Sequence, residues 1–128
     1  MPLPEDIVQR QLDAFNDHDL EAFLLLFADD VVIHDLVDGS VVLRGIAAFR
    51  DRYERVFRER PLVRAELAGR LSLGSFVVDR ELLTDGDDHP PEDALAIYQV
   101  EGPLVTRMWF IEPEHRRRTA PISTSRSP

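Results

Sequence analysis

IVQRQLDAFNDHDLEAFLLLFADDVVIHD, residues 7–35, is the most informative part of the sequence for the fold. Its apolar residues recur at the spacing of amphipathic helices on both sides of a polar turn at 16–19. In that turn, Asp17 or Asp19 can accept backbone N–H bonds at the start of the second helix. Ala28-Asp29-Asp30 is predicted to end this helix before a β-branched strand that leads to Asp35. The stretch therefore predicts two short helices and a strand that ends in one carboxylate.

The rest of the chain predicts a hairpin, a third helix and further strands. Asp38-Gly39 is typical of a hairpin turn between two short strands. An apolar stripe after Gly45 predicts a helix that ends at Pro61. Strands are then expected at 62–73, 76–84, 94–101 and 104–111. Helices first and consecutive strands afterwards indicate an α+β domain with a mostly antiparallel sheet.

Composition restricts the partners and the chemistry. The chain has 128 residues and a net charge of −9, which disfavours nucleic acid and anionic membranes because phosphate binding needs a basic face. The sequence has no Cys, which excludes thiolate ligands, and its four His residues are scattered, which argues against a metal site. No apolar run approaches the roughly 18 residues of a membrane span. We expect a cytoplasmic protein without metal or cofactor.

One domain is expected to cover residues 4–112. The segment 113–128 contains Arg116-Arg117-Arg118 followed mainly by Ser, Thr and Pro, and it has no apolar periodicity. Such a composition cannot bury enough apolar surface to order the chain. A disordered tail is therefore predicted at 113–128.

The order and spacing of the elements in 7–35 resemble the opening of the nuclear-transport-factor-2-like superfamily, in particular its SnoaL-like polyketide cyclase and ketosteroid isomerase branches. The resemblance implies a cone-shaped fold, with three N-terminal helices packed on a curved sheet around a pocket. In ketosteroid isomerase, the carboxylate that matches Asp35 is the general base. Gln11 and Ala96 stand where that enzyme has its two oxyanion donors, a tyrosine and a protonated aspartic acid. Efficient 3-oxosteroid isomerisation is therefore not expected.

Side chains alternate between the two faces of a strand, so the resemblance also implies which residues line the pocket. The inward strand residues would be Ile33, Asp35, Asp79, Glu81, Leu83, Ala96, Tyr98, Arg107 and Trp109. The helices would add Gln11, Phe15, Phe49, Tyr53 and Phe57. A phase error of one residue would instead put Asp79 and Glu81 in water. Arg107 is expected to pair with one of these two acids, because unpaired burial of a charge is costly.

Two functions fit these predicted pocket residues. In the first, a pocket enzyme without a cofactor acts on a small apolar organic ligand by isomerisation, cyclisation or dehydration. Asp35 would be its general base, because an apolar pocket raises the pKa of a carboxylate into the useful range. Arg107, with Gln11 or Tyr98, would stabilise the developing negative charge.

Alternatives stay open for the catalytic residues and for the role of Asp35. Limonene-epoxide-hydrolase-like members of the superfamily suggest a variant in which Asp79, Glu81 and Arg107 activate water. Asp35 could instead only hold the hairpin at 37–40 by hydrogen bonds. The second of the two functions is a non-catalytic ligand-binding or dimerisation module. Such a module needs the cavity but no catalytic residue.

A homodimer through the sheet is also expected. The concave face of a curved sheet is covered by helices, whereas apolar side chains on the convex face need another cover, and such patches usually mark an interface. The convex residues predicted from the strands are Val77, Leu82, Leu95, Ile97, Met108 and Phe110.

Overall fold

The computed structural model describes residues 2–86 and 88–111. The predicted tail at 113–128 and the last residue of the predicted domain lie outside the described residues. The helices are α1 (Pro4–Asn16), α2 (Leu20–Leu24) and α3 (Ile46–Glu59). The strands are β1 (Phe27–Asp35), β2 (Val41–Arg44), β3 (Val63–Leu73), β4 (Phe76–Asp85), β5 (Glu92–Glu101) and β6 (Leu104–Ile111).

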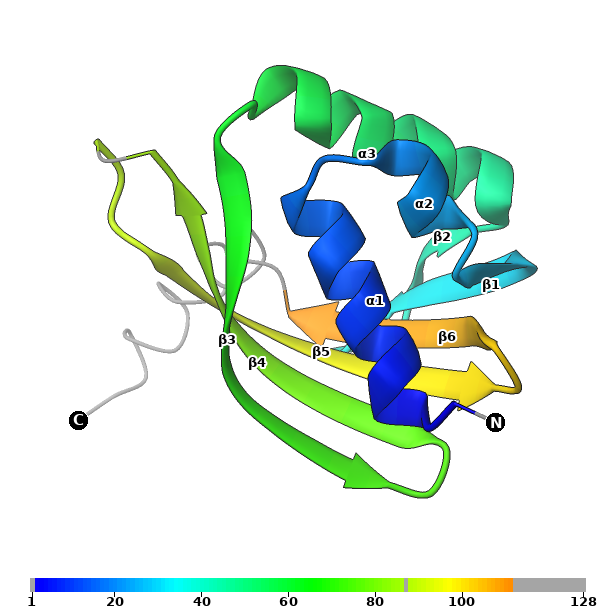
Figure 1. Ribbon diagram of the computed structural model, residues 1–128. Coiled ribbons are helices and arrows are strands. Elements are labelled where there is room, and N and C mark those ends of the chain that lie inside the picture. The colour runs from blue at the N-terminus through cyan, green and yellow to red at the C-terminus, as the bar shows by residue number, and fades with distance from the viewer. Residues whose placement is uncertain (1, 87, 112–128) are drawn as a thin grey trace.

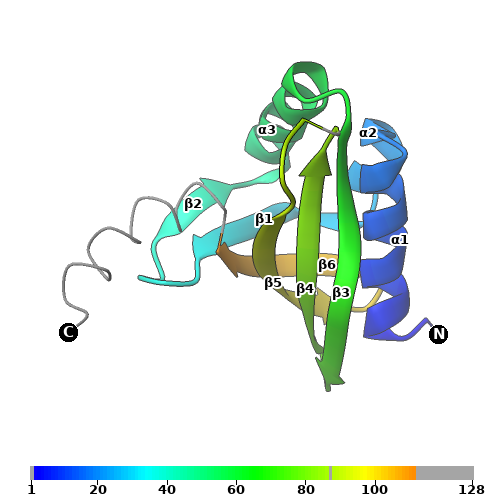
Figure 2. The same ribbon diagram turned by 90° about the vertical axis from the view of Figure 1, so that its left-hand side faces the viewer.

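The strands form one curved sheet of six strands in the order β2-β1-β6-β5-β4-β3. All neighbouring pairs are antiparallel except β1 and β6, which run parallel. Helix α1 lies across the concave side of the sheet, and α3 lies above it (Figures 1 and 2). This architecture confirms the predicted α+β class with three helices on a mostly antiparallel sheet. No helix in the described part of the chain is long and apolar enough to cross a membrane.

The second helix is shorter and the first strand longer than the sequence predicted. Helix α2 ends at Leu24, and β1 already begins at Phe27. Phe27 pairs with Val105 of β6, whose backbone N–H donates a 2.8 Å hydrogen bond to the carbonyl of Leu26. Because this pairing joins residues far apart in the sequence, the local acidic pattern could not reveal it.

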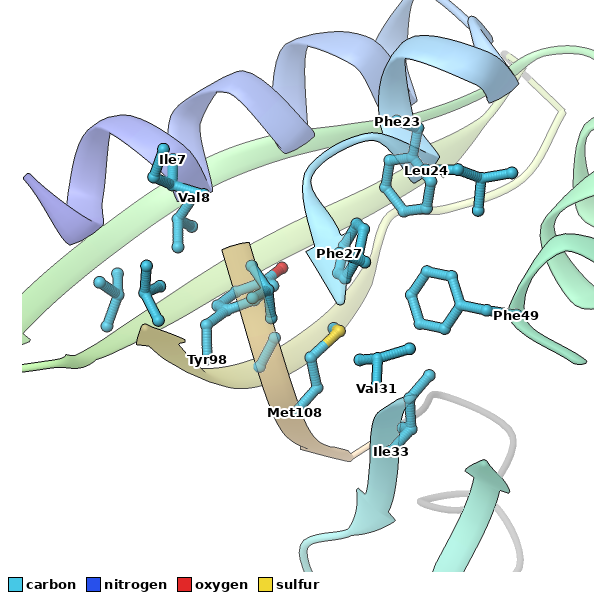
Figure 3. Close-up of a cluster of buried hydrophobic side chains, with 14 of the residues drawn as sticks. Ile7, Val8, Phe23, Leu24, Phe27, Val31, Ile33, Phe49, Tyr98 and Met108 are labelled. Carbon is cyan, nitrogen blue, oxygen red and sulfur yellow. The ribbon is translucent and has the colours of Figure 1, made fainter. Parts of the chain in front are cut away.

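The core lies between the helices and the concave face of the sheet. Figure 3 shows side chains from α1, α2, α3, β1, β5 and β6 that converge there. The largest fully buried apolar side chains are Phe23, Phe49, Ile7, Ile33, Val8 and Val31. Burying a side chain of this size contributes about 1.5–3 kcal/mol, so this cluster fixes α1 against the sheet.

The strand registers place Arg107 and Trp109 on the convex face, so the prediction that they point inward is wrong. Buried Ile33 of β1 pairs with Met108, and Asp35 pairs with Phe110 two residues further along the same face. Side chains alternate along β6, so Arg107 and Trp109 must point the other way. The parallel register with β1 fixes this phase, which the sequence of β6 alone leaves open.

The same registers correct the predicted convex face. Val77, Met108 and Phe110 belong to the buried inner side, where they pack in the core cluster or against it. On the outer side, one row of paired residues crosses the sheet from Leu71 through Val78, Ile97 and Trp109 to His34. The rings of His34 and Trp109 stack with their centroids 5.5 Å apart.

Candidate functional site

A cavity of about 650 Å³ lies between α1, α3 and the inner face of β3 to β6. This volume is within the range of ligand pockets, about 300–1,000 Å³. Most of its wall is apolar and includes Leu12, Phe15, Phe23, Tyr53, Ala65 and Met108. A few buried polar side chains share the wall, which is the usual composition of a site for small organic molecules.

Glu81 of β4 supplies a carboxyl group to the buried part of this wall. It lines the cavity with only 8% of its surface exposed. Burial raises the pKa of Glu81 from its ordinary value of 4.5 to about 7, and the negative charge of Asp79 adds to the rise. The charge of Arg70 and a hydrogen bond from Tyr98 act in the opposite direction. A carboxylate with a pKa near 7 can accept and return a proton at neutral pH.

Tyr98 of β5 and Gln11 of α1 form a buried hydrogen-bond pair beside Glu81. The Gln11 amide N–H donates to the Tyr98 hydroxyl oxygen at 3.1 Å. Burial raises the pKa of Tyr98 well above 10, so the phenol keeps its proton at neutral pH. The hydroxyl oxygen accepts from Gln11, and the hydroxyl proton remains free to donate to Glu81. Side chains from three elements thus form one polar group in an apolar cavity.

Asp79 faces inward on β4 but does not line the cavity. Its carboxylate is 0% exposed and accepts two hydrogen bonds from Arg70 of β3, at 2.7 and 2.9 Å. Arg70 donates a third bond, of 2.9 Å, to the Gln9 side-chain oxygen on α1. The acid is therefore paired with Arg70 and not, as predicted, with Arg107. The sequence contains a signal for this pair, because the short turn Gly74-Ser75 sets a register that places Arg70 opposite Asp79.

Asp35 and Arg107 do not meet in the cavity. Asp35 lies on the inner face beside Phe110 but outside the cavity wall. Its carboxylate accepts a 2.8 Å hydrogen bond from the backbone N–H of Val37, which is the hairpin role considered as its alternative. Arg107 is exposed on the convex face, 6.0 Å from the centre of the Trp109 ring. These positions contradict the predicted arrangement of the two residues.

The structure also separates the aromatic candidates. Phe15 and Tyr53 line the cavity. Phe49 is fully buried behind it, with its ring centre 4.8 Å from that of Tyr53. The ring of Phe57 stacks on that of His18, with the ring centres 4.6 Å apart.

The arginines of the cavity mouth were not predicted from the sequence. Arg52 and Arg55 of α3, and Arg60 just after it, line this part of the wall. Residues three or four positions apart share one face of a helix, so the spacing of 52, 55 and 56 could have placed Arg52 and Arg55 on the side of Val56. Among residues 2–86 and 88–111, no group of three or more His, Cys, Asp or Glu residues could hold a metal ion.

Comparisons with known proteins agree with this fold. The SnoaL-like domain family matches residues 8–108 of the chain. A cystatin-fold protein from Novosphingobium aromaticivorans is 26% identical, with a TM-score of 0.78 over 88% of this chain and 100% of that chain. A proposed polyketide cyclase from Sinorhizobium meliloti is 20% identical, with a TM-score of 0.71 over 87% of this chain and 95% of that one.

A proposed ketosteroid isomerase from Kribbella flavida is also 20% identical, with a TM-score of 0.70 over 84% of this chain and 75% of that one. The likenesses to the proposed cyclase and the proposed isomerase show the fold alone. No protein with a curated description matches the chain. The family match covers more than half of the residues, and the chain belongs to the SnoaL-like domain family.

Proposed function

We propose that this chain is an acid–base enzyme that moves a proton on a small, largely apolar carbonyl compound, as in an isomerisation or a cyclisation. Glu81 is the general base, and Tyr98, oriented by Gln11, is the hydrogen-bond donor to the substrate oxygen. The observation that carries the proposal is the position of Glu81, buried in the cavity wall with its pKa raised to about 7. Asp35, expected as the base from the family resemblance, is replaced in this role.

The proposed reaction begins with removal of a proton from the carbon next to the carbonyl group. The ionised Glu81 carboxylate takes this proton, and the electron pair of the C–H bond moves onto the carbonyl oxygen to give an enolate. Protonated Glu81 is neutral, so the hydrogen bond from Tyr98 no longer stabilises a charge there. The phenol O–H can therefore turn to the enolate oxygen. Donors that act at the developing charge typically contribute a few kcal/mol each.

The proton then returns in one of two ways. In an isomerisation, Glu81 returns it to another carbon of the same enolate. In a cyclisation, the enolate carbon attacks a second carbonyl group, and the proton ends on the new alkoxide. Solved structures of this fold that are described as a proposed polyketide cyclase and a proposed ketosteroid isomerase support a reaction of this class.

Exchange of carbon-bound protons tests the proposal without knowledge of the natural substrate. The probe is 2-tetralone, an apolar ketone with acidic C–H bonds, and exchange in D₂O is followed by ¹H NMR. We expect the native chain to accelerate the exchange and Glu81→Gln to lower the acceleration by about 10²-fold or more. Asp35→Ala is the matched control and should stay within about threefold of the native rate, because Asp35 lies outside the wall.

Two outcomes would contradict the proposal. Equal exchange rates for the native chain and Glu81→Gln would show that Glu81 is not the general base. Saturable binding of 2-tetralone without any acceleration would instead identify a non-catalytic ligand-binding module, the second function expected from the sequence.

We also propose that two copies of the chain associate through the convex face of the sheet. Leu71 and Leu73 of β3 are 75% and 84% exposed there, and Phe76 of β4 adds an exposed ring next to Trp109. The face is built from adjacent strands, and an exposed apolar patch of this kind can form a self-complementary contact about a two-fold axis. A second copy is the partner proposed for this surface.

A further inference from the structure

We propose that the ligands of this cavity are apolar acids, in which a ring system carries an ionised carboxylate, and that Arg55 recognises the carboxylate at the mouth. The inference rests on the proposed function in one respect only, namely that the cavity is the ligand site. It adds the class of substrate, which neither the fold nor Glu81 determines.

The arginines of helix α3 divide into two groups. Arg50 and Arg58 lie outside the cavity wall and form ion pairs with Glu21 and Glu54. Arg52 and Arg55 lie in the cavity wall, with Arg60 just beyond the helix. The mouth is thus rich in guanidinium groups, although the chain as a whole has a net charge of −9.

Within the cavity wall, Arg55 is the guanidinium available to a ligand. Arg60 is held by Asp85, with 2.8 Å between its Nε and a carboxylate oxygen. Arg52 packs over the ring of Phe110, 5.6 Å from its centre. No carboxylate of the described residues forms an ion pair with Arg55. The wall contains three arginines and two acids, Glu81 and Glu92, so positive charge is in excess there. A planar guanidinium group matches a carboxylate with two parallel hydrogen bonds.

The two ends of the cavity differ in a way that orients such a ligand. Glu81, Tyr98 and Gln11 are buried, whereas Arg55 is exposed at the surface. A carboxylate at the mouth keeps part of its hydration, and its apolar body extends along the wall past Val56 towards Glu81. The reverse orientation would bring two carboxylates together in a buried site, which is unfavourable.

A pair of probes of equal shape tests this inference by isothermal titration calorimetry. The probes are 2-naphthoate, which is anionic, and 2-naphthamide, which is neutral. We expect the native chain to bind the naphthoate at least about tenfold more tightly, which corresponds to about 1.4 kcal/mol. Arg55→Gln should reduce this ratio to about one by weakening the naphthoate alone. 2-Tetralone should displace the naphthoate, because both occupy the same cavity.

Control variants separate recognition from a general effect of charge. Arg58→Gln makes the same change on the same helix outside the cavity wall and should keep the native ratio. Arg55→Lys keeps the charge without the planar fork and should give an intermediate ratio. Circular dichroism checks that each variant folds.

The inference is overturned if neither probe binds, if the native chain shows no preference, or if Arg55→Gln and Arg58→Gln behave alike. Failure of the proposed function is distinguishable from these results. Glu81→Gln should still prefer the naphthoate, so a preference that depends on Arg55 without any proton exchange would refute the chemistry alone. Proton exchange without a preference would refute only the assignment of apolar acids.

Discussion

Glu81 is held where its ionised form is unfavourable, and this should be visible in the stability of the protein. Its pKa is raised from 4.5 to about 7, so between these values the folded state binds more protons than the unfolded state. The corresponding stabilisation is therefore complete below pH 4.5 and is lost as the pH rises through 7. At about 1.4 kcal/mol for each pKa unit, the loss amounts to about 3 kcal/mol.

Glu81→Gln should remove this pH dependence. We expect the variant to be more stable than the native chain at pH 8, by about 2–3 kcal/mol, because a neutral amide replaces a buried charge. At pH 4.5, the two should be about equally stable. Urea unfolding at both pH values measures the difference, and a variant less stable than the native chain at pH 8 would contradict the raised pKa.

At the scale of elements, the Arg70–Asp79 ion pair ties β3 to β4 and, through Gln9, to α1. Arg70→Met should destabilise the fold by about 3–5 kcal/mol, because it leaves a fully buried carboxylate without its partner. Arg80→Met is the matched control on β4. It removes the exposed ion pair with Asp93 and should cost no more than about 1 kcal/mol. Chemical denaturation measures the free energy of unfolding of both variants. Similar decreases would show that the buried ion pair stabilises the fold no more than the exposed one.

The strands show how far the sequence could predict the site. The phase of β4 followed from the family resemblance, so Glu81 was expected in the pocket, and Tyr98 on β5 was expected there for the same reason. The prediction that Arg107 and Trp109 of β6 point inward was wrong because the register of β6 depends on its pairing with β1. The two strands lie far apart in the sequence, so local patterns could not reveal this pairing. The role of Asp35 depends on a hydrogen bond in the hairpin turn, and the family position alone cannot reveal this bond.

At the scale of the whole molecule, the convex face should determine the oligomeric state. We expect a dimer at micromolar concentration in analytical ultracentrifugation. Leu71→Glu combined with Leu73→Glu should give a monomer, since charges opposite each other in an apolar contact are costly. Leu25→Glu changes an equally exposed leucine, 77% exposed on the helical side of the molecule, and should leave the dimer intact. A native monomer, or dissociation by Leu25→Glu, would contradict the proposed interface.

The proposed chemistry requires that the cavity hold a carboxyl group that titrates at neutral pH. A ¹³C NMR titration of the glutamate side-chain carboxyl groups tests it most directly, with the Glu81 signal assigned by its disappearance in Glu81→Gln. We expect a midpoint at about 7, as burial in the wall and the nearby charge of Asp79 require. A midpoint close to the ordinary value of 4.5 would rule out Glu81 as the general base, because Glu81 would then lack the proton affinity that the proposed chemistry needs.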